Sequence, residues 1–213
     1  MLEIDTRLRV SHGIGKDETE ASQRAFEQLK QQGQTEPPAL VSDGWGGIRE
    51  SLVETFGRVP TYKGRGRPPT QKQASESWLY LQVIKQRDDK GRFLGIKPKA
   101  IFGAMDVLLD IFGTNTNYIE RAHLTMRNDC ARLGRKSINF SKVPKFHKAA
   151  IIWDDVTYNL TKAHKSLRIE INPSAKRFQR RFKPQSPAMK AGLTDHVWSI
   201  EKLLRSVPIT TNS

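Results

Sequence analysis

Two carboxylates in this sequence stand where a protein can bind a metal ion, and Asp43 is the first. It follows a short apolar run at 39–42 that predicts a buried strand, and Gly44 after it lets the backbone turn. Ligand sites in open α/β sheets lie at the carboxyl ends of strands, so a carboxylate here is well placed to bind a ligand. An Asp-Gly pair is also typical of an ordinary turn, and that alternative stays open.

Glu120 is the second carboxylate, in the first turn of a helix predicted from 117 to about 133. The helix macrodipole alone favours an acid at this position. The residues that follow it are strongly basic: Arg121, Arg127, Arg132, Arg135 and Lys136. A lone acid among phosphate-binding side chains suits a divalent cation, because two-metal phosphoryl transfer clamps two ions about 4 Å apart between carboxylates from separate elements.

Other polar residues have both a functional and a structural interpretation, and the structural interpretation is the more common one for each. His123 lies one turn beyond Glu120, where it can contact a phosphate or the metal shell, or simply pack as a helix residue. The loop that contains Arg65 and Arg67 has an Arg-Gly-Arg-Pro segment that can lie in a narrow A·T minor groove, or can be a flexible basic loop.

Charge is distributed unevenly along the 213 residues, whose formal net charge is +14. Residues 1–60 carry 7 basic and 10 acidic side chains, whereas residues 121–190 carry 17 basic and 4 acidic ones. Such a field suits a polyanion, and we expect nucleic acid as the partner. The single cysteine, Cys130, excludes an internal disulfide and a multi-cysteine zinc site.

The chain has no apolar run long enough for a membrane span, and its first residues lack the pattern of a signal peptide. We therefore expect a cytoplasmic protein that is associated with the nucleoid when it binds DNA, and no membrane partner.

The elements that position these residues begin as strand, strand, helix, strand, helix, which is typical of an α/β fold. The predicted strands are 2–6, 8–14 and 39–42, and the predicted helices are 17–32, with a capping box from Asp17 to Glu20, and 45–56. Farther on, we predict a loop at 62–77, a hairpin at 78–97, helices at 105–112, 117–133, 144–164 and 197–204, and a basic tail at 172–190.

Several stretches together resemble one family, and the resemblance extends over nearly the whole chain. They are VSDGW at 41–45, NYIERAHLTMR at 117–127, ARLGRKSINFSK at 131–142, YN at 158–159 with HKSLR at 164–168, and SPAMKAGLTDHVW at 186–198. This set resembles the bacterial insertion-sequence DDE transposases related to the insertion sequence one group.

The resemblance implies a ribonuclease-H-like mixed sheet with flanking helices over residues 1–170, with an insert at about 62–112, and a basic C-terminal extension over 171–213 with a short helix. Such enzymes use two Mg²⁺ (or Mn²⁺) ions to cut DNA at transposon ends and to join the freed 3′-hydroxyl to target DNA. Whether they act as a homo-oligomer on DNA stays open for this chain.

By the same resemblance, Asp43 matches the second catalytic aspartate and Glu120 the catalytic glutamate, both as metal ligands. The side chains implied to face DNA are Arg121, His123, Arg127, Arg135 and Lys136, to which the charge pattern adds Arg132, Lys142, Arg65 and Arg67.

The sequence departs from the family at the first catalytic aspartate, because no earlier strand carries it. Asp5 can substitute as a metal ligand, or can be a turn residue. We therefore expect a sequence that begins inside the catalytic domain, without its first central strand. The alternative function is a non-catalytic, DNA-binding transposase remnant. An RNA-binding protein is less favoured, because the sequence has no aromatic recognition strand of the RNP type.

Overall fold

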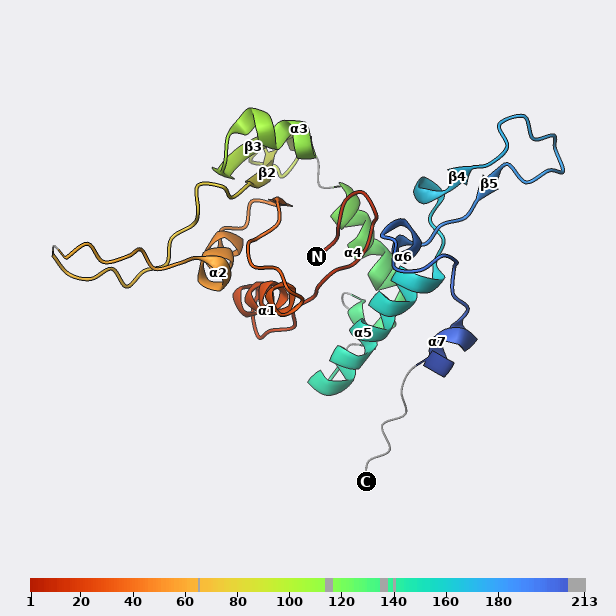
Figure 1. Cartoon of the computed structure of the whole chain (residues 1–213), viewed down its shortest axis with the longest axis horizontal. Coiled ribbons are helices and arrows are strands. Elements are labelled where there is room, and N and C mark those ends of the chain that lie inside the picture. The colour runs from red at the N-terminus through yellow and green to blue at the C-terminus, as the bar shows by residue number, and fades with distance from the viewer. Residues whose placement is uncertain (65, 114–116, 135–137, 140, 207–213) are drawn as a thin grey trace, which may run out of the picture. The chain divides into compact units, whose positions relative to one another are not determined.

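The computed structural model describes residues 1–64, 66–113, 117–134, 138–139 and 141–206. Within them the fold is mixed α/β, with seven α-helices and a small mixed sheet of three strands (Figure 1). The chain divides into two compact units. The first unit is Met1 with 11–120, and the second unit is 2–10 with 121–213.

The first unit contains the three-stranded sheet and three helices, and a fourth helix begins at its end. The elements are α1 (Glu18–Gln31), β1 (Leu40–Ser42), α2 (Gly47–Phe56), β2 (Tyr80–Arg87), β3 (Phe93–Phe102), α3 (Met105–Phe112) and α4 (Asn117–Asp129).

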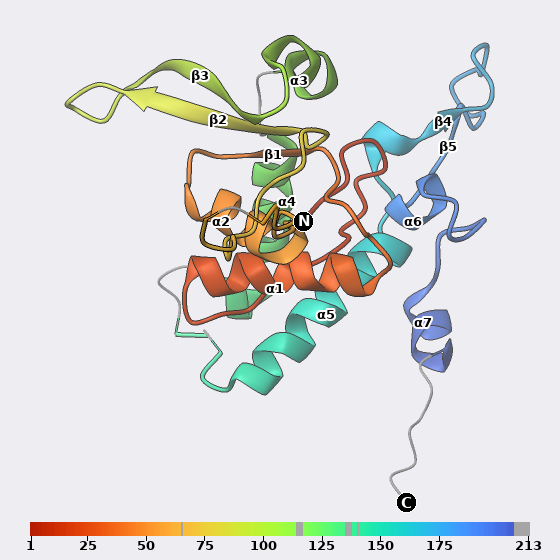
Figure 2. The ribbon, with the colours of Figure 1, turned by 60° about the vertical axis from the view of Figure 1, so that its left-hand side comes forward.

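The middle strand of this sheet is β2 (Figure 2). It pairs in parallel with β1, where Ser42 lies opposite Gln82, and antiparallel with β3. Because side chains alternate along a strand, Leu81 and Val83 lie on one face, where they pack with the fully buried Leu108 of α3. Helix α3 therefore covers one face of the sheet, and the hydrophobic core of the sheet lies between them.

Helix α1 begins at the predicted residue. The Asp17 carboxylate accepts the N–H of Glu20 at 2.8 Å, and the Glu20 carboxylate accepts the N–H of Lys16 at 2.7 Å. The first bond satisfies a backbone donor that the first turn leaves without a partner, and the second ties the residue before the N-cap to the helix, so the predicted helix start is confirmed. On the buried face of α1, Phe26 packs edge-on against Phe56 of α2, with ring centroids 6.3 Å apart.

The second unit is mainly helical. Its elements are the rest of α4, the 3₁₀ turns η1 (Ala131–Leu133) and η2 (Lys165–Leu167), α5 (Pro144–Thr161), α6 (Pro187–Lys190), α7 (Ile200–Ser206), and the two-residue strands β4 (Ile169–Glu170) and β5 (Phe182–Lys183).

Arg9 ties the N-terminal segment to α5. Its Nη1 donates to Asp154 Oδ2 at 2.6 Å and to Asp155 Oδ1 at 3.1 Å, and its guanidinium lies 3.8 Å from the centroid of the Tyr158 ring. Asn159 exchanges two hydrogen bonds of 2.9 Å with the backbone of Arg9. Residues far apart in the sequence thus form one buried ionic cluster, which we call the Arg9 clasp.

The structure corrects several element boundaries. The strands predicted at 2–6 and 8–14 are reduced to a single bridge between Leu2 and Arg9, because the backbone of Arg9 is bonded to α5 instead of to a sheet. Helix α4 ends at Asp129 and α5 at Thr161, earlier than expected, and the last helix is displaced to Ile200–Ser206.

Other predictions agree with the structure or stay open. The hairpin at 78–97 and the helix at 105–112 are confirmed, as is the mixed α/β class. None of the described helices has the length and apolarity needed to cross a membrane. The ribonuclease-H-like topology and the division at residue 170 stay predictions.

Candidate functional site

The loop that carries Asp43 turns sharply after β1. The exposed Asp43 carboxylate accepts the N–H of Trp45 at 3.3 Å, which closes an Asx turn. The backbone at Gly44 lies close to β2, since a Cβ there would lie 3.0 Å from Cγ1 of Ile84 and the Ile84 side chain would have to shift. At Gly47 a Cβ would lie 2.4 Å from the Trp45 ring, so the indole folds back over this glycine.

Two buried side chains of β2 hold this loop in place. Gln82 Nε2 donates to the carbonyl oxygen of Trp45 at 3.0 Å and to the Tyr80 hydroxyl at 3.1 Å. The Tyr80 hydroxyl and Ser42 Oγ are 2.8 Å apart, and Ser42 Oγ donates to the Asp43 carbonyl at 2.8 Å. The donors therefore run in one direction, from Gln82 through Tyr80 and Ser42 to the Asp43 backbone.

The phenol of Tyr80 stays protonated in this network. Burial raises the pKa of Tyr80 above its usual value, and the nearby Asp43 carboxylate raises it further. A neutral hydroxyl can serve as donor and acceptor together, which is what its place between Gln82 and Ser42 requires. The backbone of the Asp43 loop is thus held by buried side chains of β2.

Glu120 lies toward the same end of the sheet as Asp43. Its carboxylate forms an ion pair with the ammonium of Lys85 on β2. Lys85 is three residues beyond Gln82, the partner of Ser42, which corresponds to about 10 Å along the strand. Because β1 and β2 are parallel, Asp43 and the Lys85–Glu120 pair both lie toward the carboxyl ends of these strands.

The described residues do not assemble the ligands for two metal ions. Nowhere in them do three or more His, Cys, Asp or Glu side chains come close enough to hold one ion. A single Mg²⁺ is commonly bound through one or two carboxylates, with water and phosphate oxygens as its other ligands. The chemistry of Asp43 and Glu120 fits that smaller set, and a metal shared between them stays a prediction.

Asp5 lies in a turn of the N-terminal segment. It is exposed, and its backbone N–H donates to Glu3 Oε1 at 3.0 Å. Asp5 belongs to the second unit, whereas Asp43 and Glu120 belong to the first. The observed contacts of Asp5 are those of a turn residue. Its role as a metal ligand stays a prediction.

Helix α4 carries three of the predicted DNA contacts. Arg121 and His123 are exposed, and Arg127 is half-buried. Within the helix, Glu120, His123 and Arg127 are spaced by three and four residues and so share one face. A phosphate backbone that follows this face would meet two of these basic side chains.

The remaining predicted DNA contacts lie on loops. Arg132 of η1 donates to Ser141 Oγ at 3.5 Å, and Lys142 and Arg67 are exposed. Arg65, Arg135 and Lys136 lie outside the described residues.

His164 is a poor candidate for a phosphate contact. Its ring packs edge-on against Tyr158 with centroids 4.7 Å apart. Burial lowers the pKa of His164 below its usual value, and the nearby Arg9 guanidinium lowers it further. The imidazole is therefore neutral near pH 7.

Sequence reasoning missed two features. Lys85, the partner of Glu120, carries no local signal, because the two residues are 35 positions apart, one on a strand and one on a helix. The hairpin formed by β4 and β5 was assigned to a basic tail, although its alternation of arginine with Phe178 and Phe182 was a usable signal.

Comparison with known proteins gave no match: no family model, curated protein or solved structure is significantly similar to this chain.

Proposed function

We propose that this chain is the catalytic domain of a DDE-type DNA transposase, with a ribonuclease-H-like sheet and with Asp43 and Glu120 as its acids. The observation that carries the proposal is the shared end of the sheet: a hydrogen-bonded loop holds Asp43 there, and Lys85 holds Glu120. The basic second half of the chain supports a DNA substrate.

In this proposal Asp43 and Glu120 bind Mg²⁺ or Mn²⁺. The bound ion would polarise a phosphodiester and lower the pKa of the attacking water or hydroxyl. Lys85 balances the charge of Glu120, and it can pair with a DNA phosphate when a metal ion takes that carboxylate. The basic side chains of α4 would contribute phosphate contacts.

A non-catalytic DNA-binding remnant is the second candidate function. It is favoured by the fact that the described residues bring no third carboxylate to Asp43 and Glu120. Two ions that share too few anionic ligands repel one another with less compensation. On this alternative the chain binds transposon ends without completing strand transfer.

The test is cleavage and joining of a duplex that carries the inverted repeats flanking the reading frame, in Mg²⁺ or Mn²⁺. Metal-dependent cleavage that falls at least about 100-fold in Asp43→Asn and in Glu120→Gln supports the transposase, since metal catalysis supplies several kcal/mol. Asp89→Asn, in the exposed β2–β3 turn, is the matched control.

The other outcomes separate the two candidates. DNA binding without any cleavage supports the remnant. Cleavage that is abolished by Asp5→Asn would make Asp5 the missing acid. Absence of DNA binding even at low salt would overturn both functions, because a basic chain that binds phosphates does so most tightly there.

A further inference from the structure

A short hairpin of the second unit, residues 168–183, carries a second set of features that suit nucleic acid. We call it the arginine hairpin. In its stem, Ile169 pairs with Lys183 and Glu170 with Phe182. At its tip, Gln179 N–H donates to the Lys176 carbonyl at 2.8 Å, which closes a turn with Arg177 and Phe178 as its central residues.

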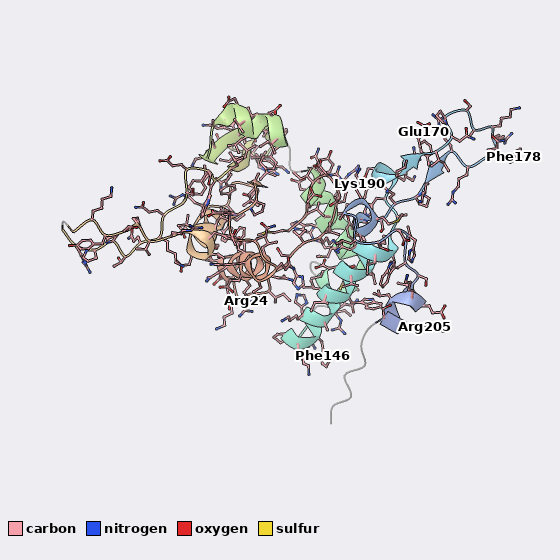
Figure 3. The ribbon with its side chains drawn as sticks, viewed as in Figure 1. Arg24, Phe146, Glu170, Phe178, Lys190 and Arg205 are labelled. Atoms are coloured by element: carbon pink, nitrogen blue, oxygen red, sulfur yellow. The ribbon has the colours of Figure 1, made fainter. Side chains whose placement is uncertain are left out.

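The ring of Phe178 stands in solvent at the tip, with 95% of its surface exposed. Figure 3 shows it at the outer end of the hairpin, well beyond Glu170 in the stem. Burial of an aromatic ring is favourable, so a ring held this far from any core is available to a ligand.

The charges around this ring are almost all positive. The hairpin contains six basic residues and one acid, Glu170, which is paired with Arg181 at 2.6 Å. From residue 171 to residue 194 the sequence has no Asp or Glu. Lys176, Arg177 and Arg180 are exposed on either side of Phe178.

The aromatic residue of the stem, Phe182, is half-buried, whereas Phe178 at the tip is exposed. The guanidinium of Arg168 lies 3.7 Å from the centroid of the Phe182 ring, and that of Arg181 lies 5.4 Å from it. These cation–π contacts cover Phe182 and stiffen the stem. At the tip, the guanidinium of Arg177 lies 5.8 Å from the centroid of the Phe178 ring, yet Phe178 stays 95% exposed, so the hairpin has a supported base and an accessible aromatic tip.

We propose that the arginine hairpin binds DNA, with Phe178 stacked on a base where the duplex is unpaired or distorted, and with Lys176, Arg177 and Arg180 on the flanking phosphates. Aromatic side chains on a cationic surface are the features that bind unstacked bases, and apolar side chains inserted at a base step act as wedges. The choice of DNA rests on the proposed function, but the stacking does not depend on its catalytic chemistry.

A nucleic acid fits this surface better than an anionic membrane. Membrane-surface elements bury a broad apolar face, whereas this tip offers one ring. Four of the six cations are arginines, whose planar guanidinium binds phosphate oxygens in pairs.

The experiment compares the full chain on two duplexes, one fully paired and one with a two-base bulge next to 2-aminopurine. We expect the native chain to prefer the bulged duplex by about tenfold, the effect of one stacked base, and to change the 2-aminopurine fluorescence. Phe178→Ala removes both effects, and Phe178→Trp retains them.

Two further variants complete the design. Phe146→Ala replaces another exposed phenylalanine, on α5, and is expected to change neither readout. The triple variant Lys176→Gln, Arg177→Gln, Arg180→Gln lowers the slope of log affinity against log salt by about two to three on both duplexes, since each phosphate contact contributes about 0.9.

Several outcomes would overturn the inference. If Phe178→Ala has a native circular dichroism spectrum and still prefers the bulged duplex, stacking of Phe178 on a base is excluded. Binding of the hairpin to phosphatidylserine vesicles, with no dependence of DNA affinity on Phe178 or the three cations, would assign it to a membrane. Asp43→Asn and Glu120→Gln are expected to leave the bulge preference unchanged, so failure of the catalytic proposal is distinguishable from failure of this one.

Discussion

A substitution of Lys85 gives the most direct test of metal binding by Glu120. The Lys85 ammonium is paired with Glu120, so it would compete with a divalent cation bound there. We expect Lys85→Met to raise the affinity for Mn²⁺ by about three- to tenfold, because removing one charge about 4 Å away changes the interaction by about 1 kcal/mol in water. Titration calorimetry or electron paramagnetic resonance measures this change, with Lys90→Met in the exposed β2–β3 turn as the control.

The double variant Lys85→Met, Glu120→Gln tests whether Glu120 is the ligand. It is expected to lose the gained affinity. If Lys85→Met leaves the affinity for Mn²⁺ unchanged, Glu120 is not a ligand of the metal.

Arg9 is the corresponding residue for stability. Arg9→Met leaves Asp154 and Asp155 buried without their guanidinium, and we expect unfolding to become about 3–5 kcal/mol easier at pH 7. Urea unfolding at pH 7 measures the loss, and Arg9→Met, Asp154→Asn is expected to recover part of it.

The loss should depend on pH in a defined direction. Burial already raises the pKa of Asp154 above its ordinary 3.8, although Arg9 opposes the shift, and removing Arg9 raises this pKa further. The folded state then holds more protons than the unfolded state in the window above 3.8, so the variant's stability falls as pH rises through that window. The deficit should therefore be smaller at pH 4.5 than at pH 7, and a deficit of equal size would contradict a charged, buried Asp154.

At the scale of an element, the loop after β1 depends on β2 for its position. Tyr80→Phe removes the donor to Ser42 and an acceptor of Gln82. We expect a loss of stability of about 1 kcal/mol, a change in Trp45 fluorescence and a several-fold weaker affinity for Mn²⁺. Tyr62→Phe is the control, since the Tyr62 hydroxyl donates to the carbonyl of Gly66 in an exposed loop. Unchanged Mn²⁺ affinity in Tyr80→Phe would show that this loop does not hold the metal.

The elements that sequence reasoning found are those with local signals. The capping pair of Asp17 and Glu20 begins α1, and glycines with positive φ follow the ends of α1 and α3, at 99° in Gly33 and 64° in Gly113. The N-terminal strands were wrong because Arg9 takes its partners 145 and 146 residues away. The arginine hairpin was missed because each strand has only two paired residues.

The candidate site divides in the same way. Asp43 and Glu120 are predicted as site residues because each stands in a recognisable local motif, and their role stays a prediction. The buried network behind Asp43 depends on the register between β1 and β2, which no local pattern specifies. The pairing of Glu120 with Lys85 joins a helix to a strand 35 residues away, so it too has no local signal.

At the scale of the whole molecule, charge should determine how DNA affinity responds to salt. Neutralising Arg127, Arg135 and Lys136 together is expected to reduce the slope of log affinity against log salt by about two to three. The matched control neutralises Lys16, Arg24 and Arg58, which lie among the acidic first 60 residues. Fluorescence anisotropy between 50 and 200 mM salt measures both slopes, a range over which phosphate contacts change affinity by orders of magnitude. An unchanged slope in the first variant would place the DNA path elsewhere.

The Arg9 clasp also has a consequence for the order in which the chain folds during synthesis. The first unit is nearly continuous in sequence, over 11–120, so it can fold while the second unit is still being made. Arg9 must wait for Asp154, 145 residues later, which at 5–20 residues per second takes about 7–30 s. During that interval the segment 2–10 has no docking site, and a slow stretch of codons before α5 would prolong its exposure to proteases.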